Sequence, residues 1–144
     1  MKYLLDASAL LPLVTKRGKQ LIAEASRENL VTTDLAIYEA CNSLWKLATL
    51  LKSISIQDAI NVATVLKEVT TRDLIGLVNY TELDFSSTFR MAYKENLTFY
   101  DTSFIKIAEG IGAILVTEDD KLKEVARKSV ETITYKELEH VLAK

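Results

Sequence analysis

Short apolar runs alternate along the chain with longer segments in which apolar residues recur every three or four positions. The runs occupy residues 2–6, 30–33, 74–83, 113–117 and 131–134. Continuous apolar runs of this length are typical of strands buried on both faces, and the longer segments predict helices. Because strands that alternate with helices pair in parallel, the pattern predicts an α/β fold with helices on both faces of a parallel sheet.

Polar side chains mark the expected helix starts, because Ser, Thr, Asp and Asn accept hydrogen bonds from the free N–H groups of a first turn. Ser8 would cap a helix that begins at residue 9, and a separate polar helix would run from Arg17 to Arg27. Asp34 would cap the helix after the second strand. Further helices are expected over 56–71 with a capping box at Ser55, over 85–94, over 100–110 with Asp101 as cap and Gly110 as stop, and from 136 onward.

The helix after the second strand is expected to reach about Leu51 and to have two distinct faces. The apolar face comprises Ile37, Cys41, Leu44, Ala48 and Leu51, with Trp45 beside it. The polar face comprises Glu39, Asn42 or Ser43, and Lys46. Side chains three and four positions apart share a helix face, so we expect the apolar set to face the core, with Cys41 as a small hydrophobic residue.

Composition narrows the class of protein. The 144 residues are 49% hydrophobic and 26% charged, as in a folded protein, and we expect one domain over residues 1–144. A net charge of -2 is not that of a polycation that coats nucleic acid. The single cysteine excludes an internal disulfide and a zinc site built from cysteines, which favours a reducing, cytoplasmic location.

No segment predicts a membrane span or a signal peptide. No uncharged run approaches the roughly 20 residues that a helix needs to cross a bilayer. Asp6 interrupts the apolar N-terminus, and no small-residue cleavage site follows it. We therefore interpret this segment as a strand.

Acidic residues follow the predicted strands. Asp6 ends the first strand, Glu39 lies just over one turn into the helix after the second, and Asp119 follows the strand at 113–117. Asp101 begins a helix whose placement depends on how the preceding segment packs. Ligands of an open parallel sheet bind beyond the carboxyl ends of its strands. Three or four carboxylates from distant parts of the chain are therefore expected to meet at one edge of the sheet.

Each acid also has a purely structural interpretation. Asp6 and Asp101 would serve as helix N-caps. Asp119 or Asp120 would cap the helix after residue 117, and Glu39 would lie on a solvated helix face. The convergence of the acids, rather than any one of them, favours a site. Clustered carboxylates stay ionised in a poorly hydrated cleft only if cations neutralise them, and the hard ions Mg2+ or Mn2+ prefer such oxygen ligands.

Four segments of the chain together resemble a known family. LLDASALL, YEACNSLWKL, FYDTSFIKIA and ILVTEDDKLKEVA occur in this order, each attached to an expected strand or helix. The pattern resembles the PIN-domain family of metal-dependent ribonucleases, and its short stand-alone form is similar to the VapC toxins of toxin–antitoxin pairs. Residues 52–97 carry no motif of the family.

This resemblance implies both a fold and a site. The implied fold is a three-layer α/β/α sandwich with a parallel sheet of strand order 3-2-1-4-5. The implied acidic quartet, which would hold Mg2+ or Mn2+, is Asp6, Glu39, Asp101 and Asp119. A leucine three positions after Asp119 favours this residue over Asp120 as the fourth acid. The implied supporting residues are Ser8, Asn42 and Thr117.

The resemblance also implies an activity. The chain would be a divalent-ion-dependent endoribonuclease that leaves 5′-phosphate and 3′-hydroxyl ends, and it would be the toxin of a toxin–antitoxin pair. A housekeeping PIN-domain RNA-processing nuclease and an inactive PIN-like scaffold are alternatives. A haloacid-dehalogenase-like phosphatase would need a second Asp where Ser8 stands, and a phospho-receiver domain would need an acidic pair after the first strand.

The partners implied by the resemblance are an RNA substrate, an antitoxin whose C-terminal segment enters the cleft, and a second copy of the chain. The apolar helices between Ile56 and Leu77 are the candidate dimer surface. When the four carboxylates are neutralised, the net charge of -2 becomes about +2, so the rest of the chain is mildly basic. His140, in the last expected helix, is expected to be solvated rather than catalytic.

Overall fold

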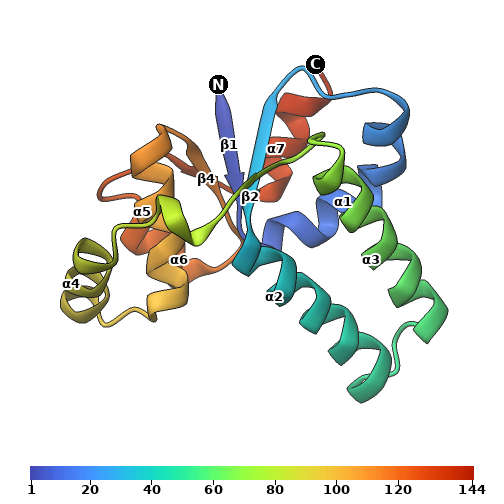
Figure 1. The fold of residues 1–144 in the computed structure, drawn as a ribbon, viewed down its shortest axis with the longest axis horizontal. Helices are drawn as coiled ribbons and strands as arrows, with labels where there is room; N and C mark the ends of the chain where they lie inside the picture. Colours follow the sequence, from blue (N-terminus) through green and yellow to red (C-terminus); the bar gives the residue numbers. More distant parts are fainter.

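Five parallel strands form the centre of the molecule (Figure 1). The computed structural model describes residues 1–144 and confirms the α/β/α sandwich, with the sheet order β3-β2-β1-β4-β5. The strands are β1 (Lys2–Leu5), β2 (Asn29–Thr33), β3 (Gly76–Val78), β4 (Ile114–Val116) and β5 (Thr132–Ile133). All four strand pairings are parallel, so every strand ends at the same edge.

Helices cover both faces of this sheet. One layer contains α1 (Ala7–Ala23), α2 (Asp34–Trp45), α3 (Ile56–Thr71) and α7 (Tyr135–Leu142), and the other contains α4 (Phe85–Glu95), α5 (Phe99–Ile111) and α6 (Asp120–Ala126) (Figure 1). A π-helical turn over Lys46–Leu50 extends α2, and a short 3-10 helix covers Tyr80–Glu82. The chain runs from β1 to β3 on one side of β1 and then continues with β4 and β5 on the other side, so the strand order reverses between β1 and β4. Because each crossover is right-handed, this reversal places α1, α2 and α3 on one face of the sheet and α4, α5 and α6 on the other.

Several predicted helix ends differ from the observed ones, and the residues that cap the helices explain why. Asp6, not Ser8, caps α1, and α1 continues to Ala23 as a single helix without a break near Arg17. Thr33 caps α2 in place of Asp34, through a hydrogen bond from the Ala36 N–H. In each case two neighbouring residues have side chains able to cap, and only the backbone geometry selects one.

The helix over residues 100–110 shows the same kind of shift. Thr98 caps α5, so Asp101 lies in the first turn with its side chain not used as a cap. The helix ends at Gly112, whose left-handed conformation (φ 65°) terminates it, rather than at Gly110. The last helix begins at Tyr135, behind a capping box of Thr134 and Glu137. Ser55 caps α3 by accepting the Asp58 N–H at 3.0 Å, but the Asp58 side chain does not complete the predicted capping box.

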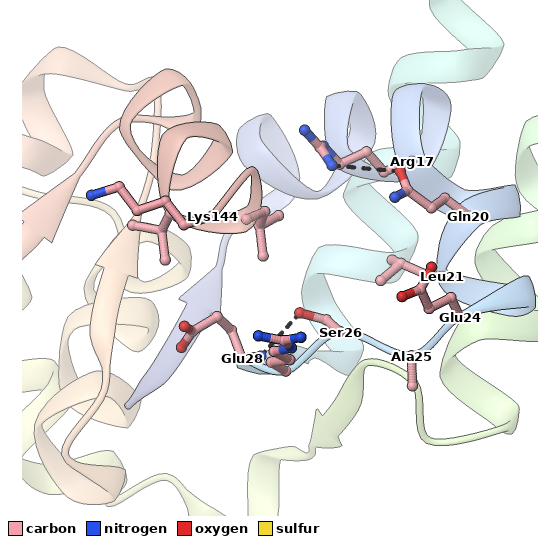
Figure 2. Close-up of a pocket in the computed structure, with 11 residues that line it drawn as sticks. Arg17, Gln20, Leu21, Glu24, Ala25, Ser26, Glu28 and Lys144 are labelled. Carbon is pink, nitrogen blue, oxygen red and sulfur yellow. Dashed lines mark hydrogen bonds between the residues drawn. The ribbon is translucent and has the colours of Figure 1, made fainter.

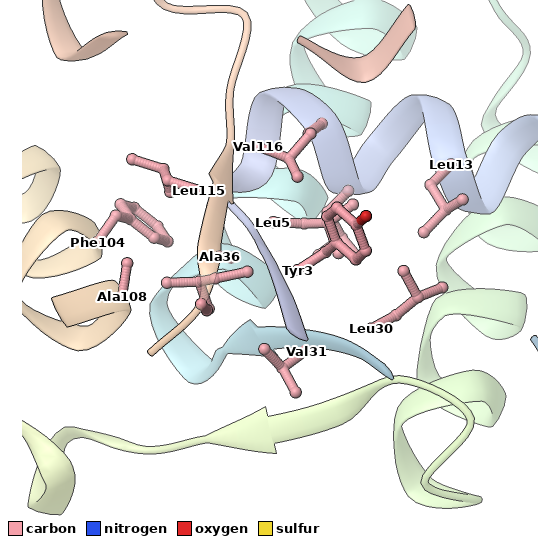
Figure 3. Close-up of a cluster of buried hydrophobic side chains, with 14 of the residues drawn as sticks. Tyr3, Leu5, Leu13, Leu30, Val31, Ala36, Phe104, Ala108, Leu115 and Val116 are labelled. Atoms are coloured by element: carbon pink, nitrogen blue, oxygen red, sulfur yellow. The ribbon is translucent and has the colours of Figure 1, made fainter. Parts of the chain in front are cut away.

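The core lies on both faces of β1 and its neighbours. Phe104 and Ala108 of α5 pack on one side of the strands and Leu13 of α1 on the other (Figure 3). Leu5 and Leu115 are fully buried between these layers. Burial of each such large side chain stabilises the fold by about 1.5–3 kcal/mol. The rigid layers hold the carboxyl ends of β1 and β4 in place.

The predicted apolar face of α2 is partly wrong. Cys41 is exposed, and Trp45 and Leu51 retain 49% and 69% of their surfaces exposed. The buried residues of α2 are Ala36, Ala40 and Leu44, so the core-facing stripe lies one position before the predicted one for most of its length. His140 is exposed, as expected. None of the helices combines the length and the apolar character needed to cross a membrane.

Gly18 permits the close approach of α1 and α3. A Cβ at this position would lie 2.5 Å from Cγ1 of Val65, a β-branched side chain with little freedom to turn away. We expect Gly18→Val to lower the free energy of unfolding by about 1–3 kcal/mol, measured by denaturant titration. The control is Gly110→Ala in α5, where a Cβ meets no atom within 4 Å and the protein should become slightly more stable.

Candidate functional site

A cleft of about 530 Å³ lies at the carboxyl edge of the sheet, where the strand order reverses. All four predicted acids line it, namely Asp6, Glu39, Asp101 and Asp119. They come from the end of β1, from α2, from α5 and from the loop after β4. The structure thus brings together carboxylates that are far apart in the sequence, including Asp101, whose placement the sequence left open.

Asp6 is the most enclosed of these acids, with 5% of its surface exposed. Its Oδ1 accepts hydrogen bonds from the Ser8 hydroxyl at 2.6 Å and from the Ala9 N–H at 3.1 Å, and its Oδ2 accepts one from the Thr117 hydroxyl. Burial raises the pKa of Asp6, these hydrogen bonds lower it, and the charge of Asp101 raises it further. The carboxylate is therefore fixed in orientation, and no cationic side chain lowers its pKa.

The hydroxyls of Ser8 and Thr117 connect the ends of β1 and β4. The Ser8 hydroxyl accepts the Glu118 N–H at 2.9 Å, and the Thr117 hydroxyl accepts the Asp119 N–H at 3.1 Å. Each hydroxyl thus donates to Asp6 and accepts from the loop that carries Asp119. This network holds two of the four acids in a fixed relation.

Thr117→Val tests this network by its effect on stability. Thr117 is fully buried, and valine matches its shape but leaves the Asp119 N–H and one oxygen of Asp6 without this partner. We expect the free energy of unfolding to fall by about 1–3 kcal/mol in thermal or denaturant melts. Thr64→Val is the control, since the exposed Thr64 hydroxyl bonds only to the Ile60 carbonyl of its own helix, and its effect should stay within about 0.5 kcal/mol.

Glu39 lies on the face of α2 that is turned toward the cleft. Asn42, Ser43 and Lys46 line the cleft from the same helix, as the predicted polar face requires. Burial raises the pKa of Glu39, and the charges of Asp101 and Asp6 raise it further, with no hydrogen-bond donor acting against them. A half-buried carboxylate of this kind is open to a cation or to water.

Asp101 and Asp119 complete the acidic wall from the other helical layer. Burial raises the pKa of Asp101 and the charge of Asp119 adds to the rise, while Thr98 and Lys121 lower it. Asp119 caps α6 by accepting the Leu122 N–H at 2.8 Å through Oδ1 and also lines the cleft. The same is true of Asp6, which caps α1.

The neighbouring acids Glu118 and Asp120 make contacts outside the cleft. Glu118 accepts the Tyr135 N–H at 2.7 Å and so joins the loop after β4 to α7. Asp120 lies outside the cleft, has a side chain that is 99% exposed and pairs with Lys123 at 3.6 Å. Of the three consecutive acids, the structure places only Asp119 at the cleft.

The donor set of the cleft fits a hard divalent cation. Carboxylate oxygens are the ligands that Mg2+ and Mn2+ prefer, and a cation would relieve the burial and repulsion that raise the pKa values of Asp6, Glu39 and Asp101. No three acidic, His or Cys side chains are grouped closely enough in the structure to hold one ion together. Mg2+ usually takes only one or two protein carboxylates and keeps several waters, so the fit does not require such a group.

A second pocket, of about 450 Å³, lies at the opposite edge of the sheet, where β2 begins (Figure 2). It is lined by Arg17, Gln20, Glu24 and Glu28 together with the end of α7. Its charges alternate in sign and belong to exposed or half-exposed side chains. This pocket contains neither a carboxylate cluster nor a buried polar group, so the acidic cleft remains the candidate site.

Sequence reasoning missed Tyr38, which lines the cleft beside Glu39 and has 78% of its surface exposed. The residue lies among apolar neighbours at the start of α2, where an aromatic ring is expected to be buried. Its spacing of four residues from Asn42 was the available signal, because side chains at this spacing share a helix face.

The fold and the cleft together define a class: an open α/β protein with carboxylates clustered at the point where its sheet reverses. Within this class, the chain belongs to the PIN-domain family, since a family model described as PIN domain matches residues 3–128. This membership excludes the phosphatase and phospho-receiver alternatives, because those proteins belong to other α/β families.

Known proteins that resemble the chain agree with this family. It is similar to Exonuclease VapC9 of Pyrobaculum aerophilum, 34% identical over 134 residues that cover 93% of this chain and 92% of the relative. It is also similar to Ribonuclease VapC3 of the same organism, 34% identical over 129 residues that cover 86% and 94%.

Two solved structures share its architecture. The crystal structure of PAE2754 from Pyrobaculum aerophilum superposes with a TM-score of 0.74 at 30% identity and covers 99% of this chain and 90% of that one. VapBC-1 from nontypeable Haemophilus influenzae has a TM-score of 0.58 at 15% identity over 94% and 99% of the two chains, which shows a shared fold.

Proposed function

We propose that this protein is a divalent-metal-dependent endoribonuclease that hydrolyses phosphodiester bonds within RNA. The observation that carries the proposal is the meeting of four carboxylates, from four separate segments, in one cleft at the sheet edge. The relatives named as a ribonuclease and an exonuclease support nuclease activity. The complete quartet argues against an inactive scaffold.

Each residue has a definite task in this proposal. Asp6, Glu39, Asp101 and Asp119 would hold Mg2+ or Mn2+, which when bound lowers the pKa of a coordinated water and offsets charge on the reacting phosphate. Ser8 and Thr117 keep the carboxylate of Asp6 oriented. No side chain acts as nucleophile; water attacks the phosphorus, the bond to O3′ breaks and O3′ leaves with a proton, which gives 5′-phosphate and 3′-hydroxyl ends.

The cleft also contains groups that suit an RNA backbone. Lys46 lines it and provides a positive charge for a phosphate adjacent to the one that reacts. The Asn42 and Ser43 side chains offer hydrogen-bond partners on the same helix face. An RNA backbone bound over the acids would therefore contact one cationic and two neutral polar side chains of α2.

The test is cleavage of a linear and a circular single-stranded RNA. Cleavage of both is expected with Mg2+ or Mn2+, loss of both with EDTA, and recovery when the metal is added back. Cleavage of the linear form alone would contradict the endonuclease proposal and assign attack at chain ends. A protein that neither binds Mn2+ nor cleaves would be the inactive scaffold.

We further propose that the protein is a cytoplasmic toxin, inhibited by a cognate antitoxin and acting as a homodimer. The VapC names of two relatives support this role, and the alternative is a housekeeping RNA-processing nuclease. Expression of the chain alone should arrest growth, and co-expression of a neighbouring short reading frame should relieve the arrest. Growth without arrest would favour the housekeeping role.

A further inference from the structure

An aromatic pocket of about 290 Å³ lies next to the acidic cleft and has no role in the chemistry proposed above. Its ring-bearing walls are Tyr38, Tyr80, Phe85, Phe99 and Tyr100. These rings come from α2, from the 3-10 helix, from α4 and from α5, so the fold assembles them from separate segments. Tyr80, Phe85 and Tyr100 each keep about half or more of their surface exposed, at 63%, 49% and 61%.

Two tyrosines belong to both the aromatic pocket and the acidic cleft. Tyr38 directly precedes Glu39 on α2, and Tyr100 directly precedes Asp101 on α5. These helices lie in opposite layers of the sandwich (Figure 1), so the two tyrosines that line both hollows come from different layers. A molecule in the pocket would therefore contact two residues, each of which directly precedes a carboxylate of the cleft.

The remaining rings support one another and leave these two tyrosines free. The ring centroids of Phe85 and Phe99 are 5.8 Å apart with their planes at 89°, and those of Tyr80 and Phe85 are 6.5 Å apart. Neither Tyr38 nor Tyr100 stacks on another aromatic ring of the protein. Edge-to-face contacts of this kind hold the back of the pocket in place.

We propose that this pocket binds one unstacked base of single-stranded RNA, with Tyr38 and Tyr100 as the stacking residues. The inference rests on the proposed function and specifies which form of RNA the cleft accepts. In a nucleotide, one sugar joins a flat base to a phosphate. Here a pocket lined by aromatic rings adjoins a cleft that suits a phosphate and a metal ion. Bases in a duplex are not free to enter such a pocket, so single strands are selected.

The chemistry of the pocket favours a base over a phosphate or an ionic group. Its lining includes no Lys or Arg, and its single acid, Asp34, already accepts the Leu35 N–H at 3.0 Å. The Ser103 hydroxyl donates its hydrogen to the Tyr100 carbonyl at 2.6 Å and can only accept from a further partner. Recognition would come mainly from stacking on the aromatic rings, which tolerates every base because each has a π-face.

The test measures binding and cleavage separately. An RNA oligomer with 2-aminopurine at successive positions is titrated into Asp6→Asn protein with and without Tyr38→Ala or Tyr100→Ala. We expect stacking to quench the probe at one position, the alanine variants to abolish the quenching, and their affinity for RNA to fall by about 5- to 150-fold. Tyr38→Phe and Tyr100→Phe should retain both. Tyr93→Ala on α4, 92% exposed and outside both hollows, is the matched control.

Cleavage with an intact Asp6 gives an independent readout. The alanine variants should raise KM by a similar factor with little change in kcat, and an abasic site at the quenched position should slow the unmodified protein but not slow Tyr100→Ala further.

Alanine variants that bind and cleave as well as the original protein would overturn the inference while leaving the nuclease proposal intact. The inference would also be wrong if they changed only the oligomeric state, since the pocket would then receive a second copy. Absence of cleavage by the unmodified protein would instead refute the proposed function, and the quenching would still decide whether a base binds.

Discussion

An Asp6→Asn variant is expected to lose about 100-fold or more of its metal-dependent RNA cleavage while remaining folded. Asparagine keeps the shape of the side chain and can still accept from the Ser8 hydroxyl and the Ala9 N–H, so the cap of α1 survives. It removes the negative charge from the acid that is most tightly oriented in the cleft. Loss of one such electrostatic group costs roughly 100- to 1,000-fold in rate. Single-turnover cleavage with excess protein and Mn2+ measures the effect.

The matched control for this prediction is Asp73→Asn. Asp73 is exposed, lies outside all of the pockets described above and has a left-handed backbone (φ 56°) that asparagine also adopts readily. Its cleavage rate should equal that of the unmodified protein, and circular dichroism should show both variants folded. Equal rates for Asp6→Asn and Asp73→Asn would mean that the acidic cleft does not perform the cleavage, or that a contaminating nuclease does.

The position of Asp6 is an example of what the sequence alone can predict about the site. A buried strand followed by an acid places that acid at the carboxyl edge of a parallel sheet, and this alone predicts where Asp6 and Asp119 lie. The order 3-2-1-4-5 was predicted as an implication of the family resemblance, and the structure confirms it. Periodicity alone does not choose between neighbouring strands, so it did not supply this order.

Side-chain tasks are less accessible, because they depend on groups that are distant in the chain. Asp6 and Thr117 are hydrogen-bonded across 111 positions, and no local pattern reports that contact. The capping and site interpretations of Asp6 and Asp119 do not exclude each other, because both residues cap a helix and line the cleft. One carboxylate oxygen accepts from the helix while the residue still lines the cleft.

Errors in the predicted faces have a similar origin. The apolar row predicts a buried Cys41, but the covered stripe of α2 consists of Ala36, Ala40 and Leu44, and Cys41 lies to the side of this stripe and is exposed. Tyr38 was missed for the opposite reason, since an aromatic ring among apolar neighbours is expected to be buried. Periodicity gives the direction of a side chain, but the neighbouring element decides whether anything covers it.

Asp101→Asn is expected to make the metal-free protein more stable and to remove most of the stabilisation by Mn2+. Burial and the charge of Asp119 raise the pKa of Asp101, so its ionised form is unfavourable when no cation is present. Bound metal should stabilise the unmodified protein by about 2.7 kcal/mol when free metal is 100 times its Kd. Asparagine removes both the repulsion and one proposed metal ligand. Thermal melts with EDTA and with Mn2+ measure both effects.

The pH dependence of the same pair gives the sign of the charge effect. A carboxyl whose folded-state pKa is raised contributes stability that is fully present below its unfolded pKa of about 3.9 and is lost as the pH rises through the folded value. In EDTA, Asp101→Asn and the unmodified protein should therefore have similar stabilities below about pH 4, and the variant should gain its advantage above it. Glu109→Gln in the same helix, which breaks only the 3.4 Å pair with Lys106, should show neither the pH-dependent gain nor a loss of metal stabilisation. An Asp101→Asn protein that keeps the full Mn2+ shift would show that Asp101 is not a ligand, and the metal would then depend on Asp6, Glu39 and Asp119.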